Sequence, residues 1–221
     1  MTAPHPFIAP AREHATILAD WLRNSVAAPH PDLGRRGAIC PFIEPALDAA
    51  ALRAYTYPLP AGNPPQVPEL VAMLGRAREV FADLPHPERP GAHAALIVLL
   101  PDLTPSQWPL VDRVHAAAKN DFVERGLMLG QFHPDCRAPA VHNPSFPVNR
   151  SPIPLLAIRR MRPHDLRFLH TDPDWFAHYA QRFGHLYTDH PGTNANPLAG
   201  LYHATAARPR TRHDHPEGEA Q

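Results

Sequence analysis

The chain has 221 residues, of which 44% are hydrophobic, and its 21 basic and 21 acidic residues give a formal net charge of zero. This length and apolar content suit one domain with a core of ordinary size, and the balanced charge argues against a nucleic-acid-binding surface. Two cysteines are too few for a disulfide scaffold, no signal peptide is recognisable and no apolar run approaches the roughly 20 residues that span a bilayer, so we expect a cytoplasmic protein without membrane contact.

The predicted elements alternate between helices and strands. Residues 1–10 are rich in proline and are expected to form a flexible N-terminus. Apolar residues recur at helical spacing in two segments, and Thr104 and Pro105 begin a third helix that Gly126 ends, so helices are predicted over 11–28, 67–84 and 104–125. Short apolar or alternating runs predict strands over 52–59, 93–100, 127–132 and 153–161.

The later part of the chain is predicted to be helical and then irregular. Two short helices fit residues 162–170 and 174–183, and the sequence from residue 186 onward is rich in His, Pro, Gly and Arg without periodicity. We therefore expect a single α+β domain over residues 11–185, with a mixed sheet of about four strands and helices packed mainly on one face. Residues 186–221 are predicted to be a disordered tail.

The segment from Gly130 to Pro154 gathers side chains that are able to carry chemistry. It lies between two predicted strands and contains two histidines, a cysteine, an arginine–serine pair and six prolines. A long connection of this kind inside a compact domain usually lines a functional cleft. His133, directly after a strand, can ligate a metal ion or haem iron or move a proton near neutral pH, and so can His142. The alternative for each is a histidine on the surface.

The two cysteines suggest a second arrangement. Cys40 lies in a proline-flanked turn, where a thiolate can ligate iron or act as a nucleophile, and where a buried thiol can equally serve as a small hydrophobic group. Together with Cys136, His133 and His142 it makes a formal Cys2His2 set, which would suit structural zinc.

Asn149 and Arg150 precede the last predicted strand. An arginine there presents a rigid fork of donors to a carboxylate, either of an amino-acid substrate or of a haem propionate. The alternative is an arginine that caps loop carbonyls.

Three motifs in this order resemble the signature of an uncharacterised bacterial family, a domain of unknown function. They are Cys40-Pro41-Phe42, Gln131-Phe132-His133-Pro134, and Asn149-Arg150-Ser151-Pro152 with Pro154. The likeness covers roughly residues 10–185 and implies no particular activity.

The layout is also similar, more distantly, to the YqcI/YcgG family of haem-dependent oxygenases, some of which hydroxylate guanidine or amine nitrogen. The matching features are Cys40 in its turn, the apolar run Leu96–Leu100, Pro139-Ala140-Val141-His142, and Asn149-Arg150-Ser151. This resemblance implies a haem-dependent oxidoreductase that acts on a polar small molecule such as an amino acid. In that hypothesis His133 or His142 ligates the iron, Arg150 holds a propionate or the substrate, and Cys40 and Asn149 line the pocket.

Two further hypotheses stay open beside haem and zinc. One is a non-enzymatic module that binds a small anion or a partner through the same loop. The other is metal-free chemistry with Cys40 as nucleophile and His133 as base. Every catalytic version requires the early cysteine, the histidines and Arg150 to converge on one cavity.

Overall fold

The computed structural model describes residues 6–60, 62, 64–85, 87, 93–188 and 197–208. The chain divides into two compact units, Met1–Met161 and Arg162–Gln221. The first unit holds a four-stranded sheet with its helices, and the described elements of the second unit are helical. Among the described residues, no helix has the length and apolar character needed to cross a bilayer.

The sheet of the first unit is mixed, as the sequence predicts. Its strands are β1 (Leu52–Thr56), β2 (Ala95–Leu99), β3 (Leu127–Phe132) and β6 (Leu155–Arg160), in the spatial order β1-β2-β6-β3. β1 is parallel to β2, and β6 is antiparallel to both of its neighbours. Because β6 alone is reversed, β3 runs in the direction of β1 and β2. The carboxyl ends of β2 and β3 therefore meet at one edge of the sheet, where Leu99 and Phe132 both pair with Leu155.

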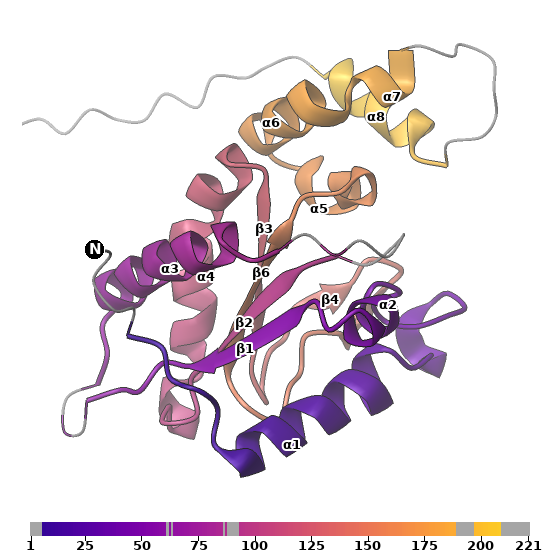
Figure 1. Ribbon diagram of the computed structural model, residues 1–221. Coiled ribbons are helices and arrows are strands. Elements are labelled where there is room, and N and C mark those ends of the chain that lie inside the picture. Colours follow the sequence, from indigo (N-terminus) through magenta and orange to yellow (C-terminus); the bar gives the residue numbers. More distant parts are fainter. Residues whose placement is uncertain are drawn as a thin grey trace, which may run out of the picture. The chain divides into compact units, whose positions relative to one another are not determined.

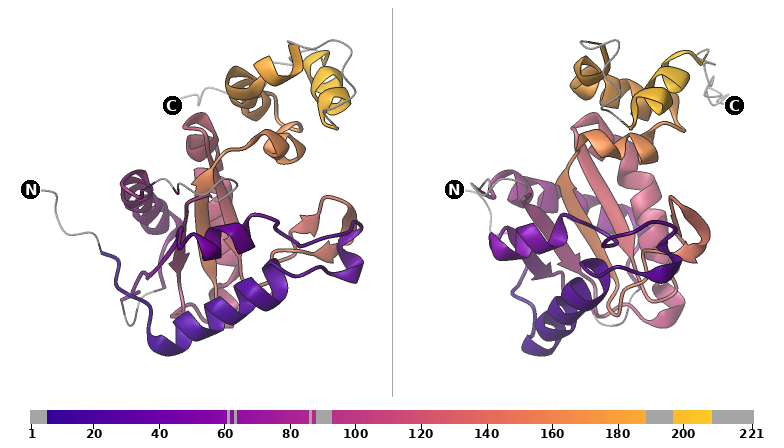
Figure 2. Two further views of the ribbon diagram at one scale, coloured as in Figure 1. Left: turned by 45° about the vertical axis from the view of Figure 1, so that its right-hand side comes forward. Right: turned by 90° about the vertical axis from the view of Figure 1, so that its right-hand side faces the viewer.

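Helices cover both faces of this sheet (Figures 1 and 2). The two longest, α3 (Val67–Ala82) and α4 (Pro109–Glu124), share one face, where they bury Leu96 and Val98 of β2. α1 (Arg12–Trp21) and the π-helical turn Leu22–Val26 that continues it cover Ile97 and Leu99 on the other face, with the short helix α2 (Ile43–Asp48) beside them. The sequence predicted helices mainly on one face of the sheet. α1 covers the other face as well, because β2 is apolar on both sides.

The connection between β3 and β6 contains a small hairpin that the sequence did not reveal. Its strands are β4 (Pro139–Ala140) and β5 (Asn143–Pro147). Prolines lack an N–H donor, which hides such a hairpin from strand patterns. The hairpin lies against the loop at Gly34, whose φ of 76° is left-handed and where an added Cβ would stand 2.5 Å from the His142 carbonyl oxygen. Glycine is therefore required at this contact.

The described part of the second unit consists of α5 (Leu166–Leu169), α6 (Pro173–Phe183), α7 (His185–Thr188) and α8 (Ala199–Ala206). α5 and α6 were predicted. α7 and α8 fall mainly in the segment expected to lack regular structure, so most of its described residues are helical. Residues 189–196 and 209–221 of that segment lie outside the described residues.

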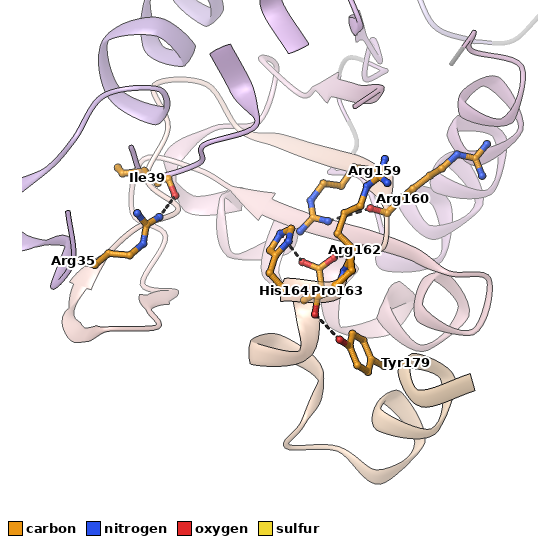
Figure 3. A network of polar contacts seen from close by, with 9 residues as sticks. Arg35, Ile39, Arg159, Arg160, Arg162, Pro163, His164 and Tyr179 are labelled. Atoms are coloured by element: carbon orange, nitrogen blue, oxygen red, sulfur yellow. Dashed lines mark hydrogen bonds and ion pairs between the residues drawn. The ribbon is translucent and has the colours of Figure 1, made fainter. Parts of the chain in front are cut away.

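Buried polar groups order this unit. The Tyr179 hydroxyl, fully buried, donates to the carbonyl of Pro163 and lies 2.6 Å from the Tyr187 hydroxyl. The His164 ring lies 3.5 Å from the buried carboxylate of Asp165 (Figure 3). Burial is the main cause of the raised pKa of Tyr179, so this phenol stays protonated.

Candidate metal centre

Three different side chains of the first unit converge at the carboxyl end of β3. Asp112, His133 and Cys136 each place one potential ligand atom within 4.8 Å of the other two. The His133 Nε2 atom lies 3.0 Å from Asp112 Oδ2, and the Cys136 Sγ atom lies 3.9 Å from Asp112 Oδ1. Oxygen, nitrogen and sulfur donors are thus brought to one point.

The chain reversal between α4 and β3 explains how Asp112 and His133 meet (Figure 1). α4 ends at Glu124, and Gly126, with a φ of 72°, reverses the chain into β3. From Asp112 to the end of α4 the helix rises about 18 Å, and from Leu127 to His133 the strand advances about 20 Å. Because these lengths match, the first turn of α4 stands beside the residue that follows β3.

A tight turn brings Cys136 to His133. The Cys136 N–H donates to the His133 carbonyl at 3.0 Å, which closes a four-residue turn with Pro134 in its second position and Asp135 in its third. Proline and aspartate both favour such turns. The first and last residues carry the imidazole and the thiol, a spacing that also occurs between paired metal ligands in zinc sites.

The imidazole and thiol are almost completely removed from water. His133 is 2% exposed and Cys136 is 0% exposed, whereas the Asp112 side chain is 45% exposed. A carboxylate only accepts hydrogen bonds, so His133 donates from Nε2 to Asp112. The Nδ1 atom of His133 is then left buried with no hydrogen-bond partner among the described residues. A buried polar atom without a partner costs free energy.

The electrostatics of Cys136 reflect this crowding. Burial raises the pKa of the thiol and the Asp112 carboxylate adds to the rise, while a backbone hydrogen bond with Ala138 and the positive charge of Arg150 act in the opposite direction. Without a cation the thiol is therefore protonated near neutral pH.

The segment that precedes β6 is fastened beside this cluster. The Asn149 side chain donates to the Gln131 carbonyl at 3.0 Å, and the Ser151 N–H donates to the His133 carbonyl at 3.4 Å. Between them, the Arg150 carbonyl accepts a hydrogen bond of 3.1 Å from the indole of Trp21. The backbone of Arg150 is thus held in place while its side chain is exposed.

The predicted site residues are only partly brought together, so the convergence of Cys40, both histidines and Arg150 that the catalytic hypotheses require is not observed. His133 lies in the cluster, and Asn149 and Arg150 flank it. Cys40 packs with the core on the α1 face of the sheet, and His142 is exposed beyond β4. The formal Cys2His2 set is not assembled, because the group of potential ligands among the described residues contains Asp112 in place of Cys40 and His142.

The sequence analysis did not include Asp112 among the candidates and named Cys136 only in the formal Cys2His2 set. The signal for Cys136 was available, since His133 and Cys136 form a His-x-x-Cys pair with the spacing of a Cys-x-x-Cys pair. Asp112 gives no comparable signal, because its place depends on how α4 docks against β3.

Comparisons with known proteins agree with an uncharacterised family. A family model described as a domain of unknown function (DUF6875) matches residues 15–194. No curated protein and no solved structure matches the chain. The proposed likeness to the YqcI/YcgG oxygenases therefore gains no support from them and stays a prediction.

Proposed function

The chain belongs to the DUF6875 family, and for it we propose the function of a metal-dependent enzyme with a mononuclear zinc centre held by Asp112, His133 and Cys136. The observation that carries the proposal is the gathering of three donor atoms of different elements within 4.8 Å of one another. Thiolate, imidazole and carboxylate are the three side-chain ligands that zinc accepts.

The spacing of the three donors supports a single ion between them. Zinc bonds of about 2.0–2.3 Å with tetrahedral angles put neighbouring ligand atoms roughly 3–4 Å apart. The two separations around the Asp112 carboxylate, 3.0 Å to His133 and 3.9 Å to Cys136, fall in this range. The second is too long to give a strong hydrogen bond, so the contact gains more from a shared cation than from the proton of the thiol.

The number of ligands favours a catalytic over a structural centre. Structural zinc sites are closed by four protein ligands, whereas catalytic sites keep one position for water or substrate. Here three ligands are present and the Asp112 side chain is 45% exposed, which leaves solvent access on that side. A zinc-bound water has a pKa lowered toward 7, so the reaction class proposed is hydrolysis by a metal-activated water.

Metal titration tests the centre. Protein stripped with a chelator is titrated with Zn²⁺ by calorimetry and with Co²⁺ by absorption spectroscopy. We expect one equivalent of either metal and a thiolate-to-cobalt charge-transfer band. Cys136→Ser should abolish that band and weaken zinc binding by at least roughly tenfold, whereas the matched variant Cys40→Ser should keep both. Equal zinc affinity in Cys136→Ser and the wild type would overturn the proposal.

Azide tests whether the centre has an open position. Azide added to the cobalt-loaded protein should change the cobalt d–d bands saturably, because it occupies the fourth position. A spectrum that azide leaves unchanged would contradict the catalytic proposal and indicate a closed, structural centre.

Haem-dependent oxygenation stays a second prediction, supported by the buried histidine after β3. Haemin titration decides it with the same protein. A saturable Soret band that shifts in His133→Gln but not in His142→Gln would favour haem over zinc as the cofactor of this site.

A further inference from the structure

We infer that the substrate of this centre is a small carboxylate, and that Arg150 binds its carboxylate group beside the metal. The inference rests on the proposed function and names the substrate class of the same site. It follows from three observations: the backbone around Arg150 is held by hydrogen bonds, its guanidinium is not paired with other described residues, and the proposed metal centre carries no net charge.

The backbone around Arg150 is pre-organised. Hydrogen bonds hold the residues on either side of it, from Asn149 to the Gln131 carbonyl and from Ser151 to the His133 carbonyl, and Trp21 holds the carbonyl of Arg150 itself. Trp21 is in turn packed edge-on against Phe132, with ring centroids 5.6 Å apart. Ser151, the residue after Arg150, thus donates directly to the backbone carbonyl of His133, a proposed metal ligand. The backbone of Arg150 therefore has little conformational freedom to lose when a substrate binds.

The Arg150 side chain does not stabilise the fold through polar contacts with the described residues. Among the residues that the structure describes, its guanidinium has no hydrogen-bond or ion-pair partner. The Arg35 guanidinium, in contrast, donates hydrogen bonds to backbone carbonyls of its own loop. Arg150 lies beside the centre, because the next residue, Ser151, donates to the His133 carbonyl at 3.4 Å. A planar guanidinium with free donors, close to a metal ligand, suits the two oxygens of a carboxylate.

Charge balance favours a carboxylate over a dianionic phosphate. A Zn²⁺ ion bound by the Asp112 carboxylate, the Cys136 thiolate and a neutral His133 forms a centre of net charge zero. Arg150 then adds one positive charge, which a monoanion neutralises. A phosphate dianion would leave one negative charge uncompensated.

Cobalt-loaded full-length protein provides the test. Its d–d bands are titrated with acetate, with the neutral isostere acetamide and with inorganic phosphate at constant ionic strength. Acetate should perturb the bands saturably, acetamide should not, and phosphate should bind more weakly than acetate. In Arg150→Gln the acetate affinity should fall roughly ten- to a hundredfold, the loss expected for hydrogen bonds to a charged group. Arg137→Gln removes an exposed arginine next to Cys136 in the chain and should leave acetate binding unchanged.

The outcomes separate the two proposals. If Co²⁺ does not bind, the metal centre itself fails. If Co²⁺ binds equally to the wild type and Arg150→Gln but acetate binds both with equal affinity, the centre stands and the role of Arg150 is overturned. Phosphate binding as tight as acetate binding would overturn the carboxylate class.

Discussion

Cys136 and His133 differ from the other candidate residues in what surrounds them. Both are buried, and both face the same carboxylate of Asp112. His115, one helical turn further along α4, shows the opposite solution: its ring is also shielded, but its Nε2 atom pairs with the Leu129 carbonyl at 3.1 Å. The Nε2 atom of His115 is therefore satisfied by a backbone carbonyl, whereas the Nε2 atom of His133 faces a carboxylate and a thiol that can share a cation with it.

The neutral state of His115 predicts a loss of stability in acid. Burial, chiefly, and then the charge of Lys119 lower its pKa from 6.5 to about 4, against opposing effects of the Leu129 carbonyl and Asp112. The unfolded chain binds a proton below pH 6.5 that the folded chain refuses until about pH 4, so stability falls as the pH decreases between these values. The loss amounts to roughly 3 kcal/mol. Urea denaturation of His115→Gln should show a correspondingly smaller decrease between pH 7 and pH 4 than the wild type, and equal decreases would refute this.

The thiols are predicted to differ in reactivity. Cys136 is fully buried and its pKa is raised, chiefly by burial, so at a given pH it presents little thiolate. Cys40 is only partly buried. Iodoacetamide labelling of metal-free protein at pH 8, followed by mass spectrometry, should modify Cys40 before Cys136. Faster labelling of Cys136 would show that the cluster is open to solvent.

At the level of secondary structure, the chain reversal between α4 and β3 brings Asp112 and His133 together. Its two arms have matched lengths, and Gly126 supplies the left-handed residue that joins them. Neither arm alone contains the site, because Asp112 belongs to the helix and His133 follows the strand. The geometry of this one reversal therefore controls the distance between the two ligands.

Two glycine substitutions test this reversal. Gly126→Ala forces a Cβ into a backbone with a φ of 72° and should lower the free energy of unfolding by about 1–2 kcal/mol. Gly75→Ala, in the interior of α3 where an added Cβ meets nothing within 4 Å, should instead raise it by roughly 0.5–1 kcal/mol. Denaturation in urea measures both. A Gly126→Ala variant as stable as the wild type would contradict the left-handed backbone conformation at Gly126.

At the scale of the whole molecule, the proposed centre lies within the first unit, and its ligands join the end of β3 to the beginning of α4. A bound metal would therefore cross-link two consecutive elements through residues that are 21 positions apart in the chain. Since only the folded chain assembles the three donors, metal binding should stabilise the native state.

Thermal unfolding measures this linkage. At a free Zn²⁺ concentration of about 100 times Kd, the stabilisation of about 2.7 kcal/mol should raise Tm by roughly 5–10 °C. Asp112→Asn and Cys136→Ser should lose most of the increase, and Cys40→Ser should retain it. An equal increase in all variants would place the zinc elsewhere in the chain.

The local sequence determined the elements of this protein. Periodic apolar residues predicted α1 and α3, and the start and stop signals Thr104, Pro105 and Gly126 predicted α4. Short apolar or alternating runs predicted the four strands of the sheet, with the β3 range 127–132 confirmed at both ends. Side-chain spacing within one helix or strand is a local property, so the sequence displays it directly. The hairpin of β4 and β5 escaped because its prolines break that pattern.

Which side chains meet depends on how these elements dock against one another. The reversed β6 lies between β2 and β3, α1 carries Cys40 onto the other face of the sheet, and the docking of α4 brings Asp112 to His133. Local sequence patterns predicted the four strands of the sheet and its longest helices, and the turn from His133 to Cys136 is formed by neighbouring residues. Asp112, which lies 21 residues before His133 in the chain, meets this turn because of packing. The burial of apolar faces fixes where helices and strands dock, and this burial depends on the whole chain.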